Sequence, residues 1–495
     1  MENPTRRSWP AEFQQAELPW AEPPEEVCEF HSPNDGELYA RFQLQNSVQA
    51  DLLLDEVFGL EPLPATQVSL ALRKMADVLD SKREVWARLI AFEGGKPLRQ
   101  ARIEAERAAL TLRWSASEAE RVAGQVIPMQ GIPQPVPADP ADRHREPAPW
   151  AFTLLEPAGP VLAILAFNHP LNLLAHAVGP ALAAGCPIVV KPALETAHTA
   201  HWFCREFAQI WRTLSTSTSI SPVRLALWSN SQTEARLTDA RWGAVQFVGS
   251  SQVGWSIARQ VHPGVRVLLE HGGAAPAILA EDADVKLAAR TLCRHGYFHS
   301  GQVCVSLQRV YVLRAVAADF IGELAREVQA LKLGDARDEA TDCGPLIRTK
   351  DADRIEAWIK EAVNQGAQVR VGGQRRGERF IEPTLIVGLP PGSRLAREEV
   401  FGPVVGVQVV ETMDEAIRLA NSTPWIFQAS VWSQSSTQLR HLASRLRATA
   451  VMCNEGPSFR VDWMPFRGEG ASGRGVGGVP GHVRELMREK LIILK

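Results

Sequence analysis

The sequence predicts an α/β protein with one domain built on a parallel β-sheet that has helices on both faces, followed by a second α/β domain. Short apolar runs alternate with helical stretches over residues 161–270, and a second alternation of the same kind begins near Asp282. The chain has 495 residues, of which 45% are hydrophobic, enough for two or three domains with large buried cores. Strands and helices that alternate in this way are typical of parallel sheets.

The first part of the chain is expected to be irregular over residues 1–45 and to turn helical from Thr66. Thr66 is the expected N-cap of the first helix, and Gly94-Gly95 is its expected stop. A second helix, dense in Arg and Glu, is expected over residues 101–122, with its charges on a solvated face. The first helix is predicted from apolar residues spaced three to four apart, namely Val68, Leu72, Met75 and Leu79.

A proline-rich segment follows the two helices. Residues 128–149 contain seven prolines, and proline is not tolerated in a helix interior. We expect this segment to be a linker or a protruding extended arm.

The two alternations define the strands and helices of the sheets. In the first, strands are expected at 161–167, 187–192, 223–228, 244–250 and 265–270. Three helices are expected between them, at 170–185, at 253–260, and in a stretch after residue 192 that runs through Phe207. In the second, helices are expected around 285–297, 316–332 and 350–365, with strands at 309–313, 369–373, 404–410 and 429–432.

Composition and charge exclude several classes of function. A net charge of -3 gives no electrostatic reason to expect nucleic acid or an anionic membrane as a partner. The seven cysteines form no C-x-x-C pair, so we expect no metal site and no thioredoxin-like motif. Free thiols fit a reducing compartment, and the N-terminus has no apolar signal region, so a cytoplasmic location is expected.

One uncharged segment has the length of a membrane span. Residues 161–190 lack Asp, Glu, Lys and Arg, but three prolines interrupt them. A buried strand, a helix and a second strand explain the segment better than a membrane helix. The prolines are Pro170, Pro180 and Pro187.

Residues 268–306 carry the clearest chemistry. They place one carboxylate, Glu270, before a Gly-Gly turn, and one thiol, Cys304, behind a Gly-Gln pair. A thiol nucleophile and a separate carboxylate base are what two-step acyl chemistry requires. The alternative interpretation is structural, because a cysteine is often a small buried hydrophobe and a strand-end glutamate can be a surface group.

Other polar residues follow strands of the first predicted sheet, at the edge where parallel sheets bind ligands. Asn168 follows the first strand, and its amide can donate to an oxyanion. Lys191 ends the next strand and can reach a ribose or a phosphate. A turn-forming asparagine and an ordinary exposed lysine are the alternatives.

Two glycine-containing turns are candidates for binding a pyrophosphate. Residues 249–254, with Gly249, Ser250 and Gly254, join a strand to a helix whose N-terminus suits an anion. A literal G-x-G-x-x-G occurs at residues 473–478, but no predicted strand precedes it. We therefore do not expect that second segment to bind a dinucleotide.

Taken together, these stretches resemble the NAD(P)-dependent aldehyde dehydrogenase superfamily from about residue 66 to the C-terminus. The wording FHSGQVCVSLQRVYV and FRVDWMPF resembles the branch that oxidises lactaldehyde, semialdehydes and phosphorylated or sulfonated aldehydes. The family's motifs stand here in the family's order, as FNHPLN, KPALET, FVGSSQVG, LLEHGG, GQVCVS, EEVFGPVV and PFRGEGASGRG.

The resemblance implies the catalytic roles. Cys304 would attack the aldehyde, and the Asn168 amide and the Cys304 backbone N–H would hold the oxyanion of the thiohemiacetal. Hydride transfer to the nicotinamide would leave a thioester, which water activated by Glu270 would hydrolyse.

The resemblance also implies a cofactor, NAD or NADP, and a small-molecule aldehyde as substrate. Glu399 and Phe401 would hold the nicotinamide ribose and ring. Lys191 and the Leu194 position would lie at the adenosine ribose. Ser250, between Gly249 and Gly254, would contact the pyrophosphate.

The family fold has three parts, a Rossmann-like cofactor domain, an α/β catalytic domain and a β oligomerisation arm. They are expected here at residues 1–127 with 158–269, at 270–475, and at 128–157 with 476–495. A homodimer or homotetramer is implied.

The chain also departs from the family pattern. Leu194 stands where the family often has a Glu that binds both ribose hydroxyls and repels a 2′-phosphate, and Glu195 could be a shifted substitute. Ala177 and Ala274 replace lysines, and Arg467 replaces a glycine. The choice between NAD and NADP therefore stays open.

Three functions remain as hypotheses. The first is an aldehyde dehydrogenase that releases a carboxylic acid. The second is a CoA-acylating relative, although Glu270 speaks against it, and the third is a binding protein that retains the fold with little turnover. A papain-like hydrolase is excluded because Cys304 lacks the matching Cys/His sequence context. An anionic substrate tail could be anchored by Arg113, Arg294 or Arg460, each of which has a structural alternative.

Overall fold

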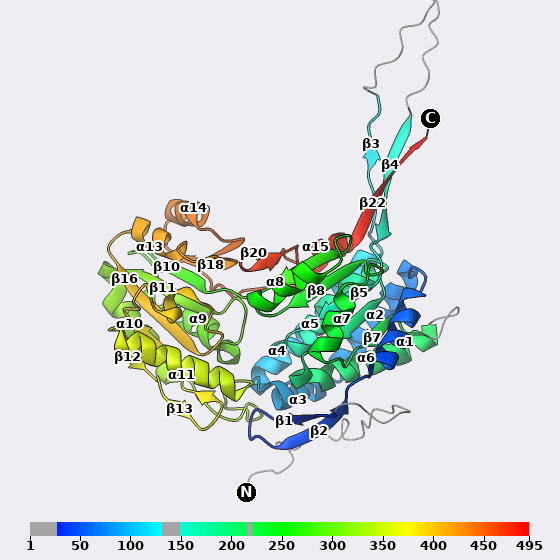
Figure 1. Cartoon of the computed structure of the whole chain (residues 1–495). Coiled ribbons are helices and arrows are strands. Elements are labelled where there is room, and N and C mark those ends of the chain that lie inside the picture. Colours follow the sequence, from blue (N-terminus) through cyan, green and yellow to red (C-terminus); the bar gives the residue numbers. More distant parts are fainter. Residues whose placement is uncertain (1–26, 131–148, 215–219, 495) are drawn as a thin grey trace, which may run out of the picture.

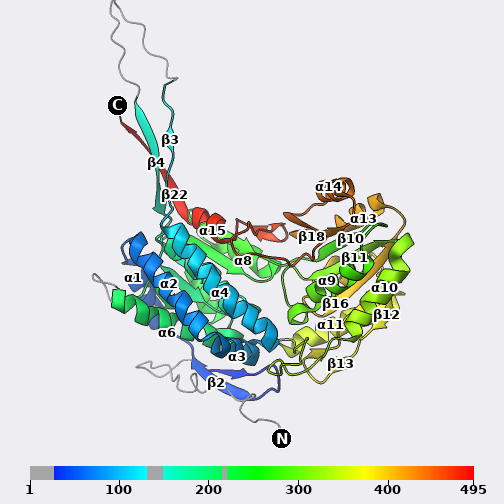
Figure 2. The same ribbon diagram turned by 180° about the vertical axis from the view of Figure 1, so that it is seen from behind.

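The computed structural model describes residues 27–130, 149–214 and 220–494. Two α/β lobes lie side by side, and a narrow sheet projects from the first of them (Figure 1). The view from behind shows α2, α4 and α6 covering one side of the first lobe (Figure 2).

The first lobe contains a six-stranded sheet in the order β21-β9-β8-β5-β6-β7. All neighbours are parallel except β21, which runs antiparallel to β9. The five parallel strands lie where the apolar runs predict them; β9 ends as expected, whereas the other four end earlier. The strands are β5 (Val161–Ile164), β6 (Ile188–Lys191), β7 (Val223–Leu225), β8 (Ala244–Val248), β9 (Arg266–Glu270) and β21 (Gly473–Arg474).

The second lobe contains a seven-stranded sheet in the order β12-β15-β16-β11-β10-β18-β19, parallel except for β12. Four of its strands match the prediction, whereas β10, β15 and β19 were not predicted. The strands are β10 (Ala275–Leu279), β11 (Leu307–Leu313), β12 (Gln368–Val371), β15 (Thr384–Val387), β16 (Val404–Val410), β18 (Gln428–Trp432) and β19 (Ala450–Cys453). Short two-stranded ladders join β13 (Arg375–Arg376) to β14 (Phe380–Ile381) and β17 (Trp425–Ile426) to β20 (Glu469–Gly470).

One predicted helix is in fact two. The apolar periodicity from Thr66 runs through α2 (Ala65–Ser81) and continues in α3 (Arg83–Gly94), and the N-cap is Pro64 rather than Thr66. The chain breaks at Lys82, whose φ of -109° and ψ of 24° are not helical, and no glycine or proline marks this break. The predicted stop is confirmed, because Gly95 ends α3 with a φ of 66°.

The remaining helices cover the sheets on both faces. The first lobe has α4 (Leu98–Ala119), α5 (Pro170–Ala183), η3 (Leu194–Thr196), α6 (Ala197–Leu214), α7 (Asn230–Leu237), α8 (Ser251–Gln260) and α15 (Val479–Glu485). The second lobe has α9 (Val285–Tyr297), η4 (Phe298–Gly301), α10 (Arg314–Gln329), α11 (Thr349–Asn364), α12 (Arg394–Arg397), α13 (Met413–Ala420) and α14 (Ser436–Arg445).

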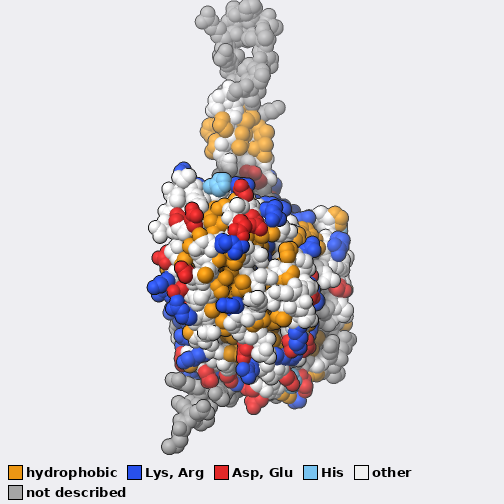
Figure 3. Space-filling model, turned by 90° about the vertical axis from the view of Figure 1, so that its left-hand side faces the viewer, with side chains coloured by type: hydrophobic (Ala, Val, Ile, Leu, Met, Phe, Trp, Pro, Cys, Tyr) orange, Lys and Arg blue, Asp and Glu red, His pale blue; other side chains and the backbone are white. Residues whose placement is uncertain are grey.

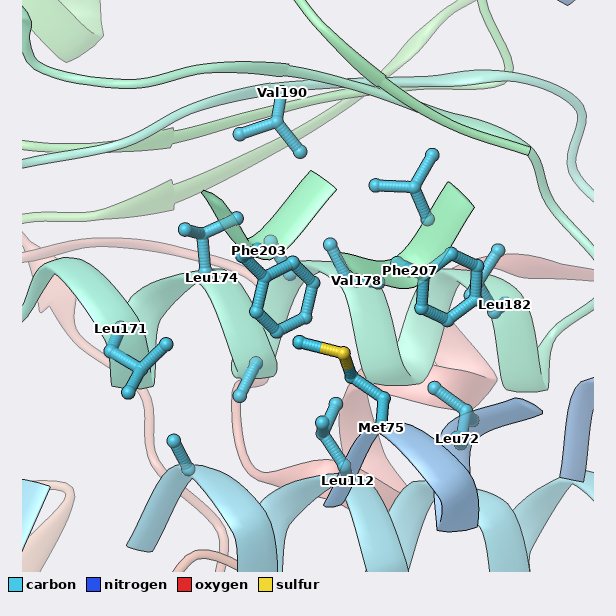
Figure 4. Close-up of a cluster of buried hydrophobic side chains, with 14 of the residues drawn as sticks. Leu72, Met75, Leu112, Leu171, Leu174, Val178, Leu182, Val190, Phe203 and Phe207 are labelled. Carbon is cyan, nitrogen blue, oxygen red and sulfur yellow. The ribbon is translucent and has the colours of Figure 1, made fainter. Parts of the chain in front are cut away.

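The core of the first lobe joins α2, α4, α5 and α6 to the sheet. Met75 of α2 points between the two rings of α6, as Figure 4 shows. Those rings belong to Phe203 and Phe207, which are fully buried, as is Val190 of β6. A buried, uncharged α5 therefore lies between sheet and helices, and among the described residues no helix combines the length and the apolar character that a bilayer crossing needs.

The expectation of irregular structure up to residue 45 is wrong for residues 27–43. Here β1 (Val27–His31) and β2 (Leu38–Gln43) form an antiparallel hairpin, and α1 (Ser47–Phe58) follows. The hairpin has one mostly exposed face, so its apolar alternation is weak. Its buried side packs on Ala197 and Leu227 of the first lobe, together with Leu194.

Contacts between the lobes fix the cleft between them. The Leu98 N–H donates to the Ala336 carbonyl over 2.9 Å, and the Ala336 N–H donates to the Asn34 side chain over 2.8 Å. Arg102 binds Glu84 of its own lobe and Glu339 of the other.

The projecting sheet contains three antiparallel strands in the order β22-β4-β3, namely β3 (Val126–Ile127), β4 (Trp150–Pro157) and β22 (Met487–Leu494). The predicted extended segment thus includes β4, while residues 131–148 lie outside the described residues. Hydrophobic side chains gather on this stalk (Figure 3), including Val126, Trp150, Leu154, Leu491, Ile493 and Leu494.

Candidate active site

A cavity of about 1300 Å³ lies between the two lobes. Its first-lobe wall is formed by the loops that follow β5, β6, β8 and β9. These are the carboxyl ends of parallel strands, where open α/β sheets bind ligands. The second lobe supplies the turn before β11, the start of α11 and the segment after α12.

Cys304 lies in the turn just before β11 and reaches the cavity wall. Its side chain packs with Val305, Phe427 and Phe466. Burial raises the pKa of the Cys304 thiol to about 12; Arg460 opposes this shift, whereas Glu399 and Glu270 add to it. The resting sulfur is therefore a thiol at neutral pH.

We expect the alkylation of Cys304 by iodoacetamide to become about tenfold faster for each unit of pH between about pH 7 and pH 9, because the thiolate is the reactive species. Arg460→Gln is expected to slow the reaction, since Arg460 lowers the pKa of this thiol. Peptide mass spectrometry measures the rate at this site, with Cys304→Ala to identify the peptide. A rate that levels off below about pH 8 would contradict the raised pKa.

The segment that precedes Cys304 has an unusual backbone. His299, Ser300 and Gly301 all have positive φ, at 49°, 52° and 71°. A Cβ on Gly301 would lie 2.0 Å from the Gly402 carbonyl oxygen, so no larger residue fits. The close approach of another backbone segment therefore explains why a glycine stands at this point.

Gln302 fastens this segment to the loop before α11. Its Nε2 donates to the His299 and Pro345 carbonyls, at 3.3 and 3.2 Å. Its Oε1 accepts from the Ile347 N–H at 3.1 Å. Since Gln302 is 1% exposed, these bonds hold the turn that carries Cys304 in one position.

Asn168 follows β5 and is buried at the cavity wall. Its Nδ2 donates to the Gln302 carbonyl over 2.9 Å, which joins the first lobe to the Cys304 turn. An amide group has two N–H donors, and this bond uses one of them.

Glu270 is the last residue of β9 and lines the same cavity as Cys304. Burial raises the pKa of its carboxyl group, and the charge of Arg460 opposes the shift. Its Oε1 would lie 2.6 Å from a Cβ on Gly477, so that glycine leaves room for the carboxylate. The segment 473–478 thus packs around Glu270, and its residues are not among those that line the cavity.

Glu399 and Phe401 lie beside this pair. Glu399 accepts the Gly273 N–H over 3.1 Å, and burial raises its pKa to about 8. A Cβ on Gly272 would lie 1.6 Å from its Oε1. Phe401 has a φ of 45°, and its ring meets that of Phe167 edge to face at 6.0 Å.

The far end of the cavity contains most of the remaining predicted residues. Lys191 is 7% exposed, and among the described residues its Nζ has no hydrogen-bond partner; burial lowers its pKa. Ser250 is the N-cap of α8, whose first turn has no acidic residue and receives no side-chain cap. Gly249 lines the wall, whereas Gly254 lies inside α8 and does not. A Cβ on Gly254 would lie 1.9 Å from His271 Nε2, so packing explains this glycine.

Of the three candidate anchors for an anion, the structure brings Arg460 to the site. Arg113 pairs with Asp77 and Asp80 away from the cavity, and Arg294, which is 68% exposed, lies 3.8 Å from Glu455 at the cavity wall. Arg460 is 13% exposed and lies close enough to Cys304 and Glu270 to affect their charges.

The guanidinium of Arg460 is only partly neutralised and hydrogen-bonded by its surroundings. Its guanidinium carbon lies 3.6 Å from the centre of the Phe466 ring, and its Nε is buried without a partner among the described residues. The nearest carboxylate, Asp462, is 3.9 Å away and is already bound by Arg107 and by His176. Burial alone would raise the pKa of Asp462, but His176 and Arg107 hold it well below its usual range.

The departures from the family pattern have local explanations. Ala177 is fully buried inside α5, and the carbonyl of Ala274 accepts two bonds from Arg309, at 3.0 and 2.8 Å. Arg467 is half exposed and pairs with Glu469. The next residue, Gly468, supplies the close approach, since its Cβ would lie 2.0 Å from the Ser472 carbonyl oxygen.

Comparisons with known proteins cover nearly the whole chain. A family model described as the aldehyde dehydrogenase family matches residues 20–492. Over 427 residues the chain is 35% identical to 3-sulfolactaldehyde dehydrogenase of Priestia megaterium, covering 86% of this chain and 85% of the relative. Over 476 residues it is 30% identical to mitochondrial succinate-semialdehyde dehydrogenase of Oryza sativa subsp. japonica, covering 94% and 86%.

Solved structures match the fold over the same range. The aldehyde dehydrogenase 21 of Physcomitrella patens, in complex with the reaction product succinate, has a TM-score of 0.86 at 28% identity and covers 95% of each chain. The NADP-dependent glyceraldehyde-3-phosphate dehydrogenase of Bacillus halodurans C-125, complexed with NADP, has a TM-score of 0.86 at 27% identity, covering 95% of this chain and 96% of that one. The fold class predicted from the sequence is confirmed.

Proposed function

Since this chain belongs to the aldehyde dehydrogenase family, we propose that it oxidises a small aldehyde to the carboxylic acid with NAD or NADP, and that Cys304 is the nucleophile. One observation carries the assignment of the site. A thiol, a carboxyl group and an amide, from three separate segments, line a single cavity. Glu270 is also near enough to Cys304 for its charge to raise the pKa of the thiol.

The cavity fits a dinucleotide. Its far end has the apolar side chains of Leu237, Phe247 and Ile257 for a base. The uncapped first turn of α8, without acidic residues, suits a pyrophosphate, and the unpartnered Lys191 suits a ribose or a phosphate. Glu399 and Phe401 would hold the nicotinamide ribose and ring beside Cys304. When bound, the nicotinamide supplies the acceptor for a hydride.

In the first half of the proposed reaction, Cys304 Sγ loses its proton to water, the resulting thiolate bonds to the aldehyde carbon, and the carbonyl electron pair moves to oxygen. Asn168 Nδ2 and the Cys304 backbone N–H, which lies against the sulfur, would donate to that oxyanion. Arg460 favours the thiolate through its charge. When the oxyanion re-forms the C=O double bond and a hydride leaves the same carbon, a thioester remains on Cys304.

In the second half, the Glu270 carboxylate takes a proton from water, and the water oxygen attacks the thioester carbon. The bond between the acyl carbon and Cys304 Sγ then breaks, which releases the carboxylic acid and leaves a thiolate that recovers its proton from Glu270. Because burial raises the pKa of Glu270, the carboxylate fraction that can act as base grows with pH.

A matrix of aldehydes against NAD and NADP tests the proposed function on the purified full chain. Reduced nicotinamide is read by its absorbance, and products are read by mass spectrometry with and without CoA. We expect equal amounts of reduced nicotinamide and free acid, independent of CoA. Formation of acyl-CoA instead of acid, or no reduced nicotinamide with any aldehyde, would contradict the proposal.

We further propose that the aldehyde carries an anionic tail bound by Arg460. This arginine is buried beside Cys304, and its nearest carboxylate, Asp462, is shared with Arg107 and His176. Relatives named for 3-sulfolactaldehyde and succinate semialdehyde support this class, since both compounds are anionic. A guanidinium in a poorly solvated site binds a carboxylate, phosphate or sulfonate strongly.

Arg460→Gln is expected to lower kcat/KM for anionic aldehydes roughly 10- to 100-fold, the effect of losing one charged hydrogen bond. A neutral aldehyde of similar length should lose much less. Arg294→Gln is the matched control, because that side chain lies at the same cavity but is mostly exposed. Equal losses of kcat/KM for charged and neutral aldehydes would contradict a role of Arg460 in binding the anionic tail. Only its effect on the pKa of the Cys304 thiol would then remain.

The projecting sheet supports assembly into a homodimer or homotetramer. Its three strands carry exposed apolar side chains, such as Val126 at 84% and Trp150 at 76% exposure. A small isolated sheet of this kind is marginally stable unless its apolar face is covered. Light scattering of the purified chain distinguishes the two states from a monomer.

The free state of all seven cysteines supports a cytoplasmic location, because a reducing compartment keeps thiols unpaired.

A further inference from the structure

An ion pair crosses the far end of the cavity. Glu195 lies in η3, just after β6 of the first lobe, and Arg348 is the N-cap of α11 in the second lobe. Arg348 Nε and Nη2 both contact Glu195 Oε1. Both side chains line the cavity, and they are 39% and 31% exposed, so solvent or a ligand can reach them.

Lys191 lies beside this pair. Glu195 and Arg348 both act on its charge, in opposite directions. The three side chains therefore form a group of two cations and one carboxylate, with a net positive charge. The Lys191 side chain is 7% exposed and lines the cavity, and among the described residues its Nζ has no hydrogen-bond partner, so an anion in the cavity would supply one.

The neighbouring position offers nothing to a ribose with two free hydroxyl groups. Leu194 packs against the N-terminal hairpin, with Phe30 and Phe42 in the same cluster, and an alkyl side chain accepts no hydrogen bond. The one carboxylate at this turn, Glu195, is engaged by Arg348. A doubly charged phosphate, in contrast, would meet an ammonium and a guanidinium.

We propose that Lys191 and Arg348 bind the 2′-phosphate of the cofactor, that Glu195 holds Arg348 in position until the phosphate replaces it, and that the chain therefore prefers NADP to NAD. This inference rests on the proposed function, because it assumes that the cavity binds a nicotinamide dinucleotide. It assigns a role to Arg348, which lies 153 residues from its partner in the sequence.

Binding of 2′,5′-ADP and of ADP to the full chain, measured by calorimetry, tests the inference without any turnover. We expect 2′,5′-ADP to bind at least about tenfold more tightly, and added salt to weaken it more than ADP. Arg348→Gln should remove about tenfold of the 2′,5′-ADP affinity and leave ADP nearly unchanged. Arg294→Gln, remote from this group and exposed, is the control that should change neither.

Glu195→Gln separates the proposal from its main alternative. If Glu195 only restrains Arg348, the variant should bind 2′,5′-ADP at least as tightly as the unmodified chain, with no loss for ADP. If Glu195 is instead a ribose ligand, ADP and NADH should bind several-fold more weakly, and the inference fails. Equal affinities for the two nucleotides in the unmodified chain would also overturn it, whereas binding of neither would refute the proposed function itself.

Discussion

Replacing Cys304 with alanine is expected to abolish aldehyde oxidation, with a loss of roughly 10⁴-fold or more. Removing a covalent nucleophile eliminates the pathway rather than slowing one step. Val305, Phe427 and Phe466 pack around the sulfur, and alanine removes only one buried atom there, so the fold should persist. The measurement is steady-state formation of reduced nicotinamide with a saturating aldehyde.

Two controls make the Cys304→Ala result specific. The variant should bind the reduced cofactor with near-normal affinity, as read by nicotinamide fluorescence, because Cys304 is not among the residues proposed to hold the nucleotide. Cys453→Ser, at an exposed thiol, should keep full activity. Turnover near that of the unmodified chain in Cys304→Ala would refute the nucleophile assignment.

Glu270→Gln is expected to slow steady-state turnover by roughly 10²- to 10⁴-fold, the usual contribution of a general base. The amide is nearly isosteric with the carboxyl group, so the close contact at Gly477 is preserved. Because only thioester hydrolysis needs this base, stopped-flow traces should begin with a burst of about one reduced nicotinamide per site. The acyl-enzyme should then accumulate and be visible by intact-protein mass spectrometry.

The pH profile separates the possible roles of Glu270. In the unmodified chain, deacylation should rise with pH through the raised pKa of this carboxyl group, and Glu270→Gln should remove that rise. Loss of the burst itself would mean that Glu270 also receives the thiol proton. Glu234→Gln, a carboxylate at the other end of the cavity, should retain both burst and turnover at saturating cofactor.

The sequence predicts the sheets better than their edges. Buried parallel strands such as β5, a continuous apolar run, and β16, which is rich in valine, are visible in the sequence. β10 has alanine and proline where branched residues would mark a strand, and the hairpin of β1 and β2 has one exposed face. The break between α2 and α3 at Lys82 carries no glycine or proline, so the two helices read as one.

At the site, the sequence predicts residues that belong to ordered motifs and misses those that distant contacts select. Cys304, Glu270 and Asn168 each stand at the end of a recognisable strand or turn. Arg460 looks like any arginine in the sequence, because its role depends on its closeness in space to Cys304 and Glu270, which lie far from it along the chain. The same holds for Arg348, because only its contact with Glu195 in the structure distinguishes it from other surface arginines.

The contact between Gly301 and Gly402 ties two events together. One glycine lies three residues before the sulfur, and the other directly follows the ring proposed to face the nicotinamide. Because bare main chain meets the place of the missing side chain at Gly301, the loop that carries the sulfur is fitted directly against the loop that carries Phe401. Docking of the redox partner and aiming of the sulfur are thus mechanically linked, so a methyl group added at Gly301 would disturb both at once.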